Sequence, residues 1–329
     1  MHPASKASRD QRIGMAAAIG AAIVYGAAYP ATAIALRSFS PLAIAGLSCT
    51  IALVLVLGLA RLGILPHPSV EAMTGRRLAR LAALACLGGL GFIAAVNVAV
   101  ALAGPTITGF VAPLYAVLAT LFAVPVLGER IGRVSIGAFA LALVGTVLLA
   151  AVDPTGQPAA GVIFAFASAA MFGLYLVLAR RWIQPYRLDG TLITIANLVG
   201  RGPVLLVAAV MFDRGPLVPG NPDPGAVIAL VSIMLGSSTT GNLLLMASVR
   251  RVAAARTSAA LLLTPVASAL LAALVLSERL APLQLAGGAL ILLSIATASG
   301  ALTTILAVVR PGRPPARPNG ALPPRDRGA

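Results

Sequence analysis

Residues 264–279 read TPVASALLAALVLSER, an apolar run that ends abruptly on a Glu-Arg pair. A similar stretch, APLYAVLATLFAVPVLGER, occupies residues 112–130, and its Glu-Arg pair stands 149 positions before the second one. Runs approaching 20 apolar residues are long enough for a helix to cross a hydrocarbon layer about 30 Å thick. Two such runs with the same charged ending, almost half a chain apart, indicate an internal repeat of membrane-spanning segments.

The composition supports a membrane protein. Of the 329 residues, 59% are hydrophobic and 10% are charged, whereas soluble domains average about 25% charged residues. A soluble chain of this kind would lack the polar residues needed to cover its core. Spanning strands would require short segments of alternating polarity, which the sequence does not show, so we predict an all-α membrane protein.

Hydropathy predicts ten transmembrane helices. Their expected bounds are 13–36, 41–60, 79–103, 105–127, 132–152, 160–179, 190–212, 225–248, 256–276 and 282–308. Several of the breaks carry a residue pair with proline, which cannot continue a helix. These pairs are Ser40-Pro41, Gly104-Pro105, Asp153-Pro154 and Asn221-Pro222. Gly104-Pro105 is all that separates the third span from the fourth.

The basic residues predict the orientation of the chain. A net charge of +15 could indicate nucleic-acid binding, but the basic residues form short clusters between apolar runs, without interleaved aromatic residues. With the N-terminus inside, twenty of the 24 Lys and Arg lie in cytoplasmic segments. Arg37, Arg214 and Arg279 lie outside, and Arg201 lies within a span. This bias predicts that both termini are cytoplasmic.

The chain divides into four parts by the same reasoning. We expect a cytoplasmic segment at 1–12, two five-helix repeats at 13–152 and 160–308, and a disordered cytoplasmic tail rich in Pro and Arg at 309–329. The first apolar run extends to Leu36, longer than the core of a secretory signal, which favours an uncleaved helix. We expect a multi-pass protein of the plasma membrane, the inner membrane of a bacterium.

An odd number of spans in each half reverses the orientation of the second half. Glu129-Arg130 would then lie on the cytoplasmic side and Glu278-Arg279 on the outer side. Two similar halves in opposite orientations form an inverted repeat, which is a common plan of secondary transporters. Such halves can open a central cavity first to one side of the membrane and then to the other.

The stretch VRRVAAARTSAALLLTPVASALLAALVLSERLAPLQLAGGALILLSIA resembles the EamA-type repeat of the drug/metabolite transporter superfamily. In the first half, GERIGRVSIGAFALALVGTVLLA echoes it, and GAAIVYGAAYPATAIALRSFSPL is similar to the first helix of the family. The helix FASAAMFGLYLVLARRW fits the corresponding position of the second half. The resemblance covers residues 14 to 300 and implies ten helices and transport of a small metabolite, usually outward.

Two features depart from the family pattern. Pro265 precedes Glu278 by 13 residues, whereas Pro113 precedes Glu129 by 16, so the two helix kinks need not correspond. Many members of the family carry an Arg within the second helix, where this chain has Ser48. The contribution of that Arg is therefore not carried over to this chain.

Arg201 is the most informative residue for function. It lies near the middle of the seventh span, in NLVGRGPVLL, and Asn197 stands one turn earlier on the same face. Charge at this depth needs water, a partner or a ligand. One reading is an anchor for a carboxylate or phosphate of the substrate. The other is an Arg that bonds the carbonyls freed by Gly202-Pro203, or that lies in a longer outer loop.

Further polar residues are candidates for contact with the substrate. Each could orient a ligand in a mainly apolar cavity or simply join two helices. They are Tyr25, Asn97, Tyr115, Tyr175 and Asn242.

The motif residues allow two readings as well. Glu129 and Glu278 could couple transport to protons, or pair structurally with Arg130 and Arg279. Pro113 and Pro265 could act as gating hinges or as packed kinks, and these two roles are compatible.

The sequence shows no catalytic constellation, no metal-ligand cluster and no phosphate-binding GxxxxGK[ST] motif. We therefore predict no cofactor and a secondary-active transporter that exports a small organic metabolite, such as an amino acid, by alternating access. The partners expected are that substrate and the lipid bilayer, with no nucleic acid, and a homodimer is left open. Alternatives are an importer or exchanger of phosphorylated or sugar-linked metabolites and, from a different class, a membrane enzyme or scaffold acting on lipids.

Overall fold

The structure is a computed structural model that describes residues 3–64, 75–129, 132–151, 158–183, 190–213, 216–249, 251–252, 257 and 260–298. Every regular element in these residues is helical. The expected tail at 309–329 and Arg130 lie outside the described residues.

The described residues of the first half contain six α-helices, one π-helical segment and one 3₁₀ turn. Its elements are α1 (Pro3–Ala35), α2 (Pro41–Arg61), α3 (Gly75–Leu84), the π-helical segment η1 (Ala85–Gly91), α4 (Phe92–Val111), the 3₁₀ turn η2 (Ala112–Leu114), α5 (Tyr115–Leu127) and α6 (Arg133–Ala150). The predicted break at Gly104-Pro105 is confirmed, because Gly104 has a φ of 78° and a ψ of 169° inside α4.

The second half follows a similar order. Its elements are α7 (Pro158–Ile183), α8 (Gly190–Phe212), α9 (Pro224–Leu235), the π-helical segment η4 (Gly236–Gly241), α10 (Asn242–Val249), α12 (Leu263–Leu276) and α13 (Pro282–Ala298). Each half therefore carries a π-helical segment in its third predicted span. Segments of this kind are rare and often lie at functional sites.

Two helices begin at side-chain caps followed by proline. Ser40 accepts a hydrogen bond from the Ala43 amide at 3.2 Å, and Asp223 accepts one from the Ala226 amide at 3.1 Å. In each case proline occupies the next position, where its missing N–H costs nothing. The Ser40 hydroxyl also donates to Asp213, which joins the start of α2 to the end of α8.

Five helical stretches of the described residues are long and apolar enough to cross a membrane. They are Asp10–Ala35, Pro41–Arg61, Leu78–Leu127, Ala159–Ala179 and Pro224–Leu245. The third has 50 residues and is divided by the break at Gly104. The described parts of α6, α8, α12 and α13 give shorter apolar helices of 10–17 residues, so the count of ten spans remains a prediction.

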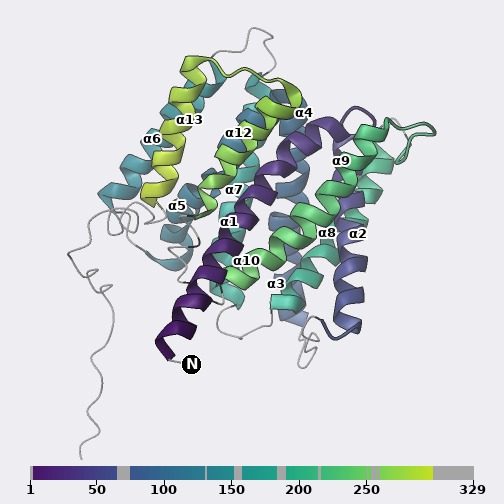
Figure 1. Cartoon of the computed structure of the whole chain (residues 1–329), viewed down its shortest axis with the longest axis horizontal. Coiled ribbons are helices and arrows are strands. Elements are labelled where there is room, and N and C mark those ends of the chain that lie inside the picture. Colours follow the sequence, from purple (N-terminus) through teal and green to yellow (C-terminus); the bar gives the residue numbers. More distant parts are fainter. Residues whose placement is uncertain are drawn as a thin grey trace, which may run out of the picture.

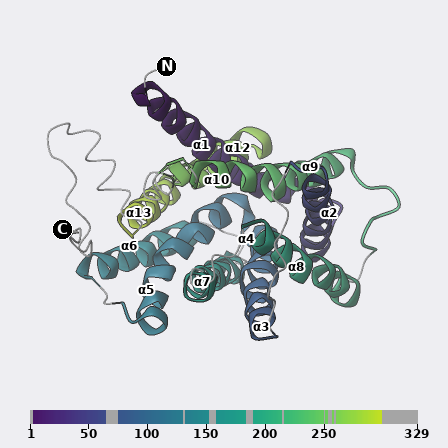
Figure 2. The ribbon, with the colours of Figure 1, turned by 90° about the horizontal axis from the view of Figure 1, so that it is seen from below.

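The helices form two layers, closed at each end by a helix pair (Figures 1 and 2). One layer holds α1, α9, α10 and α12, and the other holds α3, α4, α5 and α7. The α6–α13 pair lies at one end of the molecule and the α2–α8 pair at the other (Figure 1). Each end pair joins the helices that occupy the same position in the two halves.

The helix contacts within each layer also repeat. A Cβ added to Gly26 of α1 would lie 2.7 Å from the Thr264 carbonyl oxygen and 3.0 Å from the Ser268 amide of α12. A Cβ added to Gly173 of α7 would lie 3.0 Å from the Tyr115 carbonyl oxygen and 3.1 Å from the Ala119 amide of α5. Both partners in α12 stand 149 positions after those in α5, so one close helix crossing occurs twice.

The two Glu-containing endings share their local geometry. Gly128 and Ser277 both adopt the left-handed conformation, with φ of 73° and 58°. The next amide then bonds back into the helix, from Glu129 to the Ala123 carbonyl and from Glu278 to the Ala272 carbonyl, each at 3.4 Å. This is how helices commonly end, because it satisfies carbonyls of the last turn. The repeated Glu-Arg pair in the sequence therefore marks the same kind of helix ending in both halves.

The α6–α13 pair crosses with almost no space between the backbones. A Cβ on Gly287 would lie 2.6 Å from the Gly145 carbonyl oxygen, and a Cβ on Gly145 would lie 2.7 Å from the Gly287 carbonyl oxygen. Ser294 also donates to the Ala138 carbonyl across this interface at 2.6 Å. Small residues allow this close approach, which is how helices associate in a membrane.

We predict that Gly287→Ala lowers the stability of the folded protein, because backbone atoms rather than a mobile side chain oppose the new methyl group. Overpacking of this kind costs about 1–3 kcal/mol. The matched control is Gly137→Ala in α6, where a Cβ would meet nothing within 4 Å. Thermal unfolding of both variants in the same detergent measures the effect, and equal melting temperatures would contradict the tight crossing.

Candidate functional site

Arg201 lies at the middle of α8, between Gly190 and Phe212. Its Nε is buried and has no hydrogen-bond partner within the described part of the chain. A buried polar atom without a partner is unusual. It indicates local strain, a water molecule bound there, or a ligand that binds there. The guanidinium donates through five N–H groups. Arg201 is therefore a cation with unused donor capacity inside the helix bundle.

The π-helical segment η1 makes room for this side chain. A Cβ on Gly89 would lie 2.9 Å from the Arg201 Cβ and 2.8 Å from its Cδ. The neighbouring Gly88 lies equally close to the Tyr175 ring, where a Cβ would come within 2.5 Å. Consecutive glycines in η1 thus allow an arginine and a tyrosine from two other helices to approach the same turn.

The other buried polar atom that lacks a partner in the described residues is Thr50 Oγ1 on α2. It lies beside α8, since a Cβ on Gly202 would be 2.9 Å from it. Both unsatisfied atoms therefore flank the Arg201-Gly202 step. Sequence reasoning missed Thr50 and considered Ser48, which the structure shows bonding to the Ala45 carbonyl of its own helix at 3.1 Å.

Tyr25 and Asn242 face each other across α1 and α10. The Tyr25 hydroxyl donates to Asn242 Oδ1 at 3.0 Å, and the Asn242 amide nitrogen donates to the Ser238 carbonyl in η4 at 2.9 Å. The Tyr25 ring packs on Gly241 of η4, where a Cβ would come within 2.8 Å. Tyr25 also lies within electrostatic reach of Arg201 and Tyr115. The two π-helical segments thus support the same region from opposite layers.

Four aromatic rings form a wall next to these polar groups. Phe172 of α7 lies 4.5 Å from Phe92, 4.8 Å from Tyr115 and 5.3 Å from Tyr175, measured between ring centroids. Rings at these separations attract one another beyond the effect of burial alone. Tyr115 and Tyr175 were predicted as individual candidates from the sequence. In the structure, Phe172 contacts both rings and connects them.

The predicted substrate residues thus fall into three groups. Arg201, Tyr25, Tyr115, Tyr175 and Asn242 belong to one connected region, which we call the central site. Asn97 does not join it, because its amide nitrogen donates to the Pro41 carbonyl at 3.1 Å and holds the start of α2. The side chain of Asn197 lies outside the described residues.

The charged motif residues lie just after the ends of α5 and α12. Arg279 is exposed, and Glu278 is bonded to Thr106, whose hydroxyl donates to Oε2 at 2.5 Å. Glu129 is exposed at the end of α5. Pro113 forms part of the 3₁₀ turn η2, and Pro265 lies in the first turn of α12, so both prolines mark interruptions of a predicted span.

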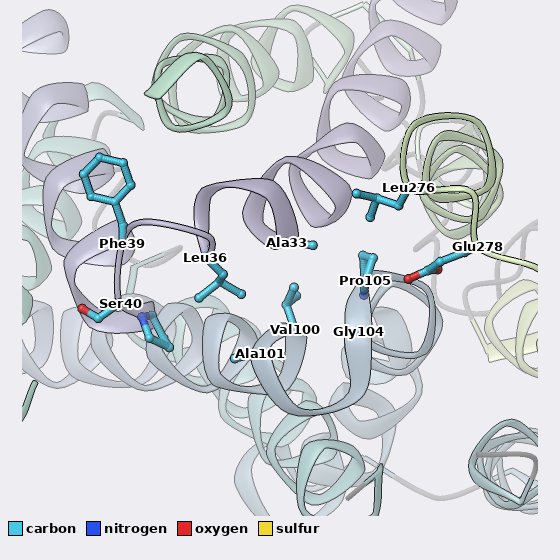
Figure 3. A pocket seen from close by; sticks show the side chains of 11 residues that line it. Ala33, Leu36, Phe39, Ser40, Val100, Ala101, Gly104, Pro105, Leu276 and Glu278 are labelled. Carbon is cyan, nitrogen blue, oxygen red and sulfur yellow. The ribbon is translucent and has the colours of Figure 1, made fainter. Parts of the chain in front are cut away.

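A cavity of about 470 Å³ opens between the ends of α1 and α12, the start of α2 and the break within α4 (Figure 3). Its wall is apolar at Leu36, Phe39, Val100 and Leu276, and its polar side chains are Ser40 and Glu278. The broken backbone at Gly104-Pro105 forms another part of the wall. We call this space the Glu278 cavity. Its size falls in the range of small-molecule sites.

The central site offers an anion one cation, a hydroxyl, an amide and an aromatic wall. A carboxylate could accept from the free Nε and an adjacent terminal nitrogen of the guanidinium in a planar, two-pronged contact. An apolar or aromatic body could then lie against the rings of Phe172 and Tyr175. Among the described residues, no group of three His, Cys, Asp or Glu side chains could hold a metal ion.

Comparisons with known proteins agree with this fold. One solved structure, described only as "Crystal structure of protein", is similar over 92% of this chain and 98% of its own length, with 20% identity and a TM-score of 0.58. No curated protein matches the chain.

The sequence model of the EamA-like transporter family matches twice, over residues 12–151 and 159–300. These matches coincide with the two halves of the structure and cover most of the chain. With its apolar helices, the chain is a multi-pass membrane protein, and it belongs to the EamA-like transporter family.

Proposed function

We propose that this protein is a secondary-active exporter of a small organic carboxylate, an amino acid or a related compound, and that Arg201 binds the carboxylate. The membership of a transporter family gives the general activity. The substrate class, the outward direction and the alternating-access mechanism are the proposed parts.

The unpartnered Nε of Arg201 is the observation that carries the proposal. A structural arginine at this depth would have its donors bound to carbonyls or to an acid, since an unsatisfied charged group in a membrane interior is costly. A free Nε on a side chain whose stem packs against Gly89 of η1 suits a group that arrives and leaves. A carboxylate supplies the acceptor oxygens that the guanidinium geometry matches.

The mechanism that we propose uses ten spans in two inverted five-helix repeats. The repeated glycine crossings at Gly26 and Gly173 support it, as do the end pairs α2–α8 and α6–α13. Each end pair would lie on a pseudo-two-fold axis in the membrane plane. Exchange of conformation between the halves would then expose the central site to one side and next to the other.

The proposed direction of insertion follows the positive charges. Both termini would be cytoplasmic, which places the Glu278 cavity on the outer side. Movement outward requires a gradient of the substrate or of a coupling ion, or exchange for a second solute.

We predict that Arg201→Ala weakens binding of a substrate carboxylate by at least about tenfold, because charge-assisted hydrogen bonds contribute about 1.5–3 kcal/mol. Arg201→Lys should bind with intermediate affinity, since an ammonium cannot reproduce the planar contact. Calorimetry of the purified protein against amino acids, organic acids, amines and sugar phosphates measures both effects, and efflux from proteoliposomes measures transport.

The control for this experiment is Arg133→Ala, which removes an exposed arginine at the start of α6. Melting temperatures of all variants separate binding from folding. A stability loss in Arg201→Ala with unchanged affinity would show that Arg201 braces the Gly202-Pro203 step instead. Preferential binding of sugar phosphates would point to the alternative class of substrate.

Gly89→Ala is expected to weaken carboxylate binding without touching the ligand directly. The new methyl group would lie within 2.9 Å of Arg201 Cβ and Cδ, so the arginine side chain must move. The matched control is Gly58→Ala in α2, where a Cβ would meet nothing within 4 Å. Binding constants from the same titration test the idea, and it fails if both alanine variants bind like the wild type.

The topology is predicted to place the 216–223 loop outside and the end of α2 inside. In a background with Cys49 and Cys86 replaced by alanine, Val218→Cys should react with a membrane-impermeant maleimide in intact cells. Leu62→Cys should react only after the membrane is opened. Both positions are exposed, at 57% and 75%, so burial does not explain a difference. The reverse labelling pattern would overturn the proposed orientation.

A further inference from the structure

The Glu278 cavity is distinct from the central site and holds a single ionisable side chain, that of Glu278. Figure 3 shows the Glu278 carboxylate directed from the end of α12 towards Pro105. Leu36 and Val100 lie between this carboxylate and Phe39, which stands at the far end of the view. The cavity is therefore an apolar space with a negative charge at one end.

The local backbone fixes the position of this carboxylate. Ser277 adopts a left-handed conformation and the Glu278 amide bonds to the Ala272 carbonyl, which turns the side chain back over the helix end. The Thr106 hydroxyl then holds Oε2 at 2.5 Å. Thr106 follows the Gly104-Pro105 break, so the break itself positions the partner of the carboxylate.

The second carboxylate oxygen remains directed at the cavity wall. A Cβ on Gly104 would lie 3.5 Å from Glu278 Oε1, and Gly104 has no side chain to fill that space. Thr106 is the partner that the described residues show for Oε2, and no basic side chain lines the cavity. Oε1 can therefore accept a hydrogen bond from a cationic ligand.

The lining selects the kind of cation. Calcium takes six to eight oxygen ligands and magnesium keeps octahedral oxygen coordination, whereas this wall offers one carboxylate and one serine hydroxyl besides its backbone. An organic ammonium needs only a few acceptors and gains from burying its carbon body against Leu36, Val100 and Leu276. Phe39 adds an aromatic surface at the opposite end.

The cavity also continues the same face of α1 that contacts the central site. Tyr25, Tyr29, Ala33 and Leu36 follow the spacing of one helical face. Tyr25 bonds within the central site, whereas Ala33 and Leu36 line the cavity. At 1.5 Å per residue, Tyr25 and Ala33 are about 12 Å apart along the helix axis.

We propose that the Glu278 cavity is a binding site for an organic ammonium group, with Glu278 as its counterion and the apolar wall holding its carbon body. The site stands on its own residues. Combined with the proposed function, on which this step rests, it identifies the substrate as an amino acid: Arg201 takes the carboxylate, and Glu278 takes the ammonium on the way out.

The test uses phenethylamine and the size-matched 3-phenylpropanoate as probes of the full-length protein in nanodiscs. Phenethylamine should bind the wild type, and Glu278→Gln should weaken it by at least about tenfold through loss of the charge. Gln keeps the acceptor for Thr106, so the helix end stays intact. Ala33→Leu fills the cavity while retaining the carboxylate, and it should weaken phenethylamine binding to a similar extent.

The matched control is Glu129→Gln, the equivalent position in the first half, which should leave amine binding unchanged. Equal amine affinity in the wild type and Glu278→Gln, or binding of Na⁺ or Mg²⁺ in place of the amine, overturns the proposal. Arg201→Ala should weaken the binding of 3-phenylpropanoate and leave the binding of phenethylamine unchanged. If the amine still requires Glu278 while the acid ignores Arg201, the cavity site stands and the proposed function fails.

Discussion

The constraint that governs this molecule is the need to satisfy every backbone N–H and C=O inside hydrocarbon. It permits continuous helices wherever the chain faces lipid, and it confines irregular backbone to places buried in protein or lining a cavity. The interruptions of these helices follow that rule. The segment η1 contacts Arg201 and Tyr175, η4 contacts Tyr25, and the Gly104 break lines the Glu278 cavity. Departures from regular helix thus coincide with the candidate binding sites.

Glycines occur at these interruptions because they make space for other parts of the bundle. A helix turn without side chains lets a long side chain from a neighbouring helix reach the bundle interior, as Gly88 and Gly89 do for Tyr175 and Arg201. Elsewhere glycine brings two backbones together, as at Gly145 and Gly287. Both uses follow from the weak driving force between helices in lipid, where close packing and polar contacts replace the hydrophobic effect.

The helices could be predicted from the sequence because hydropathy and proline punctuation are local signals. Bounds such as 41–60 and 190–212 agree with α2 and α8 to within a residue, and the Gly104-Pro105 break is present. Arg201 was identifiable because charge is rare at mid-span. The π-helical segments, Thr50, Phe172 and the Glu278 cavity could not be predicted, since they arise from contacts between distant segments. Asn97 shows that a polar residue within a predicted span need not belong to the central site. Its observed hydrogen bond is to the Pro41 carbonyl, at the start of α2.

The crossing of α6 and α13 has a mechanical consequence. The backbones at Gly145 and Gly287 lie so close that the two helices cannot approach each other further there, whereas a rotation about this point leaves their separation unchanged. A pivot of this kind converts one rocking motion into opposite displacements above and below itself. In the alternating-access mechanism that we propose, narrowing on one side of the membrane and widening on the other would then be a single movement, so that both entrances could not stand open at once.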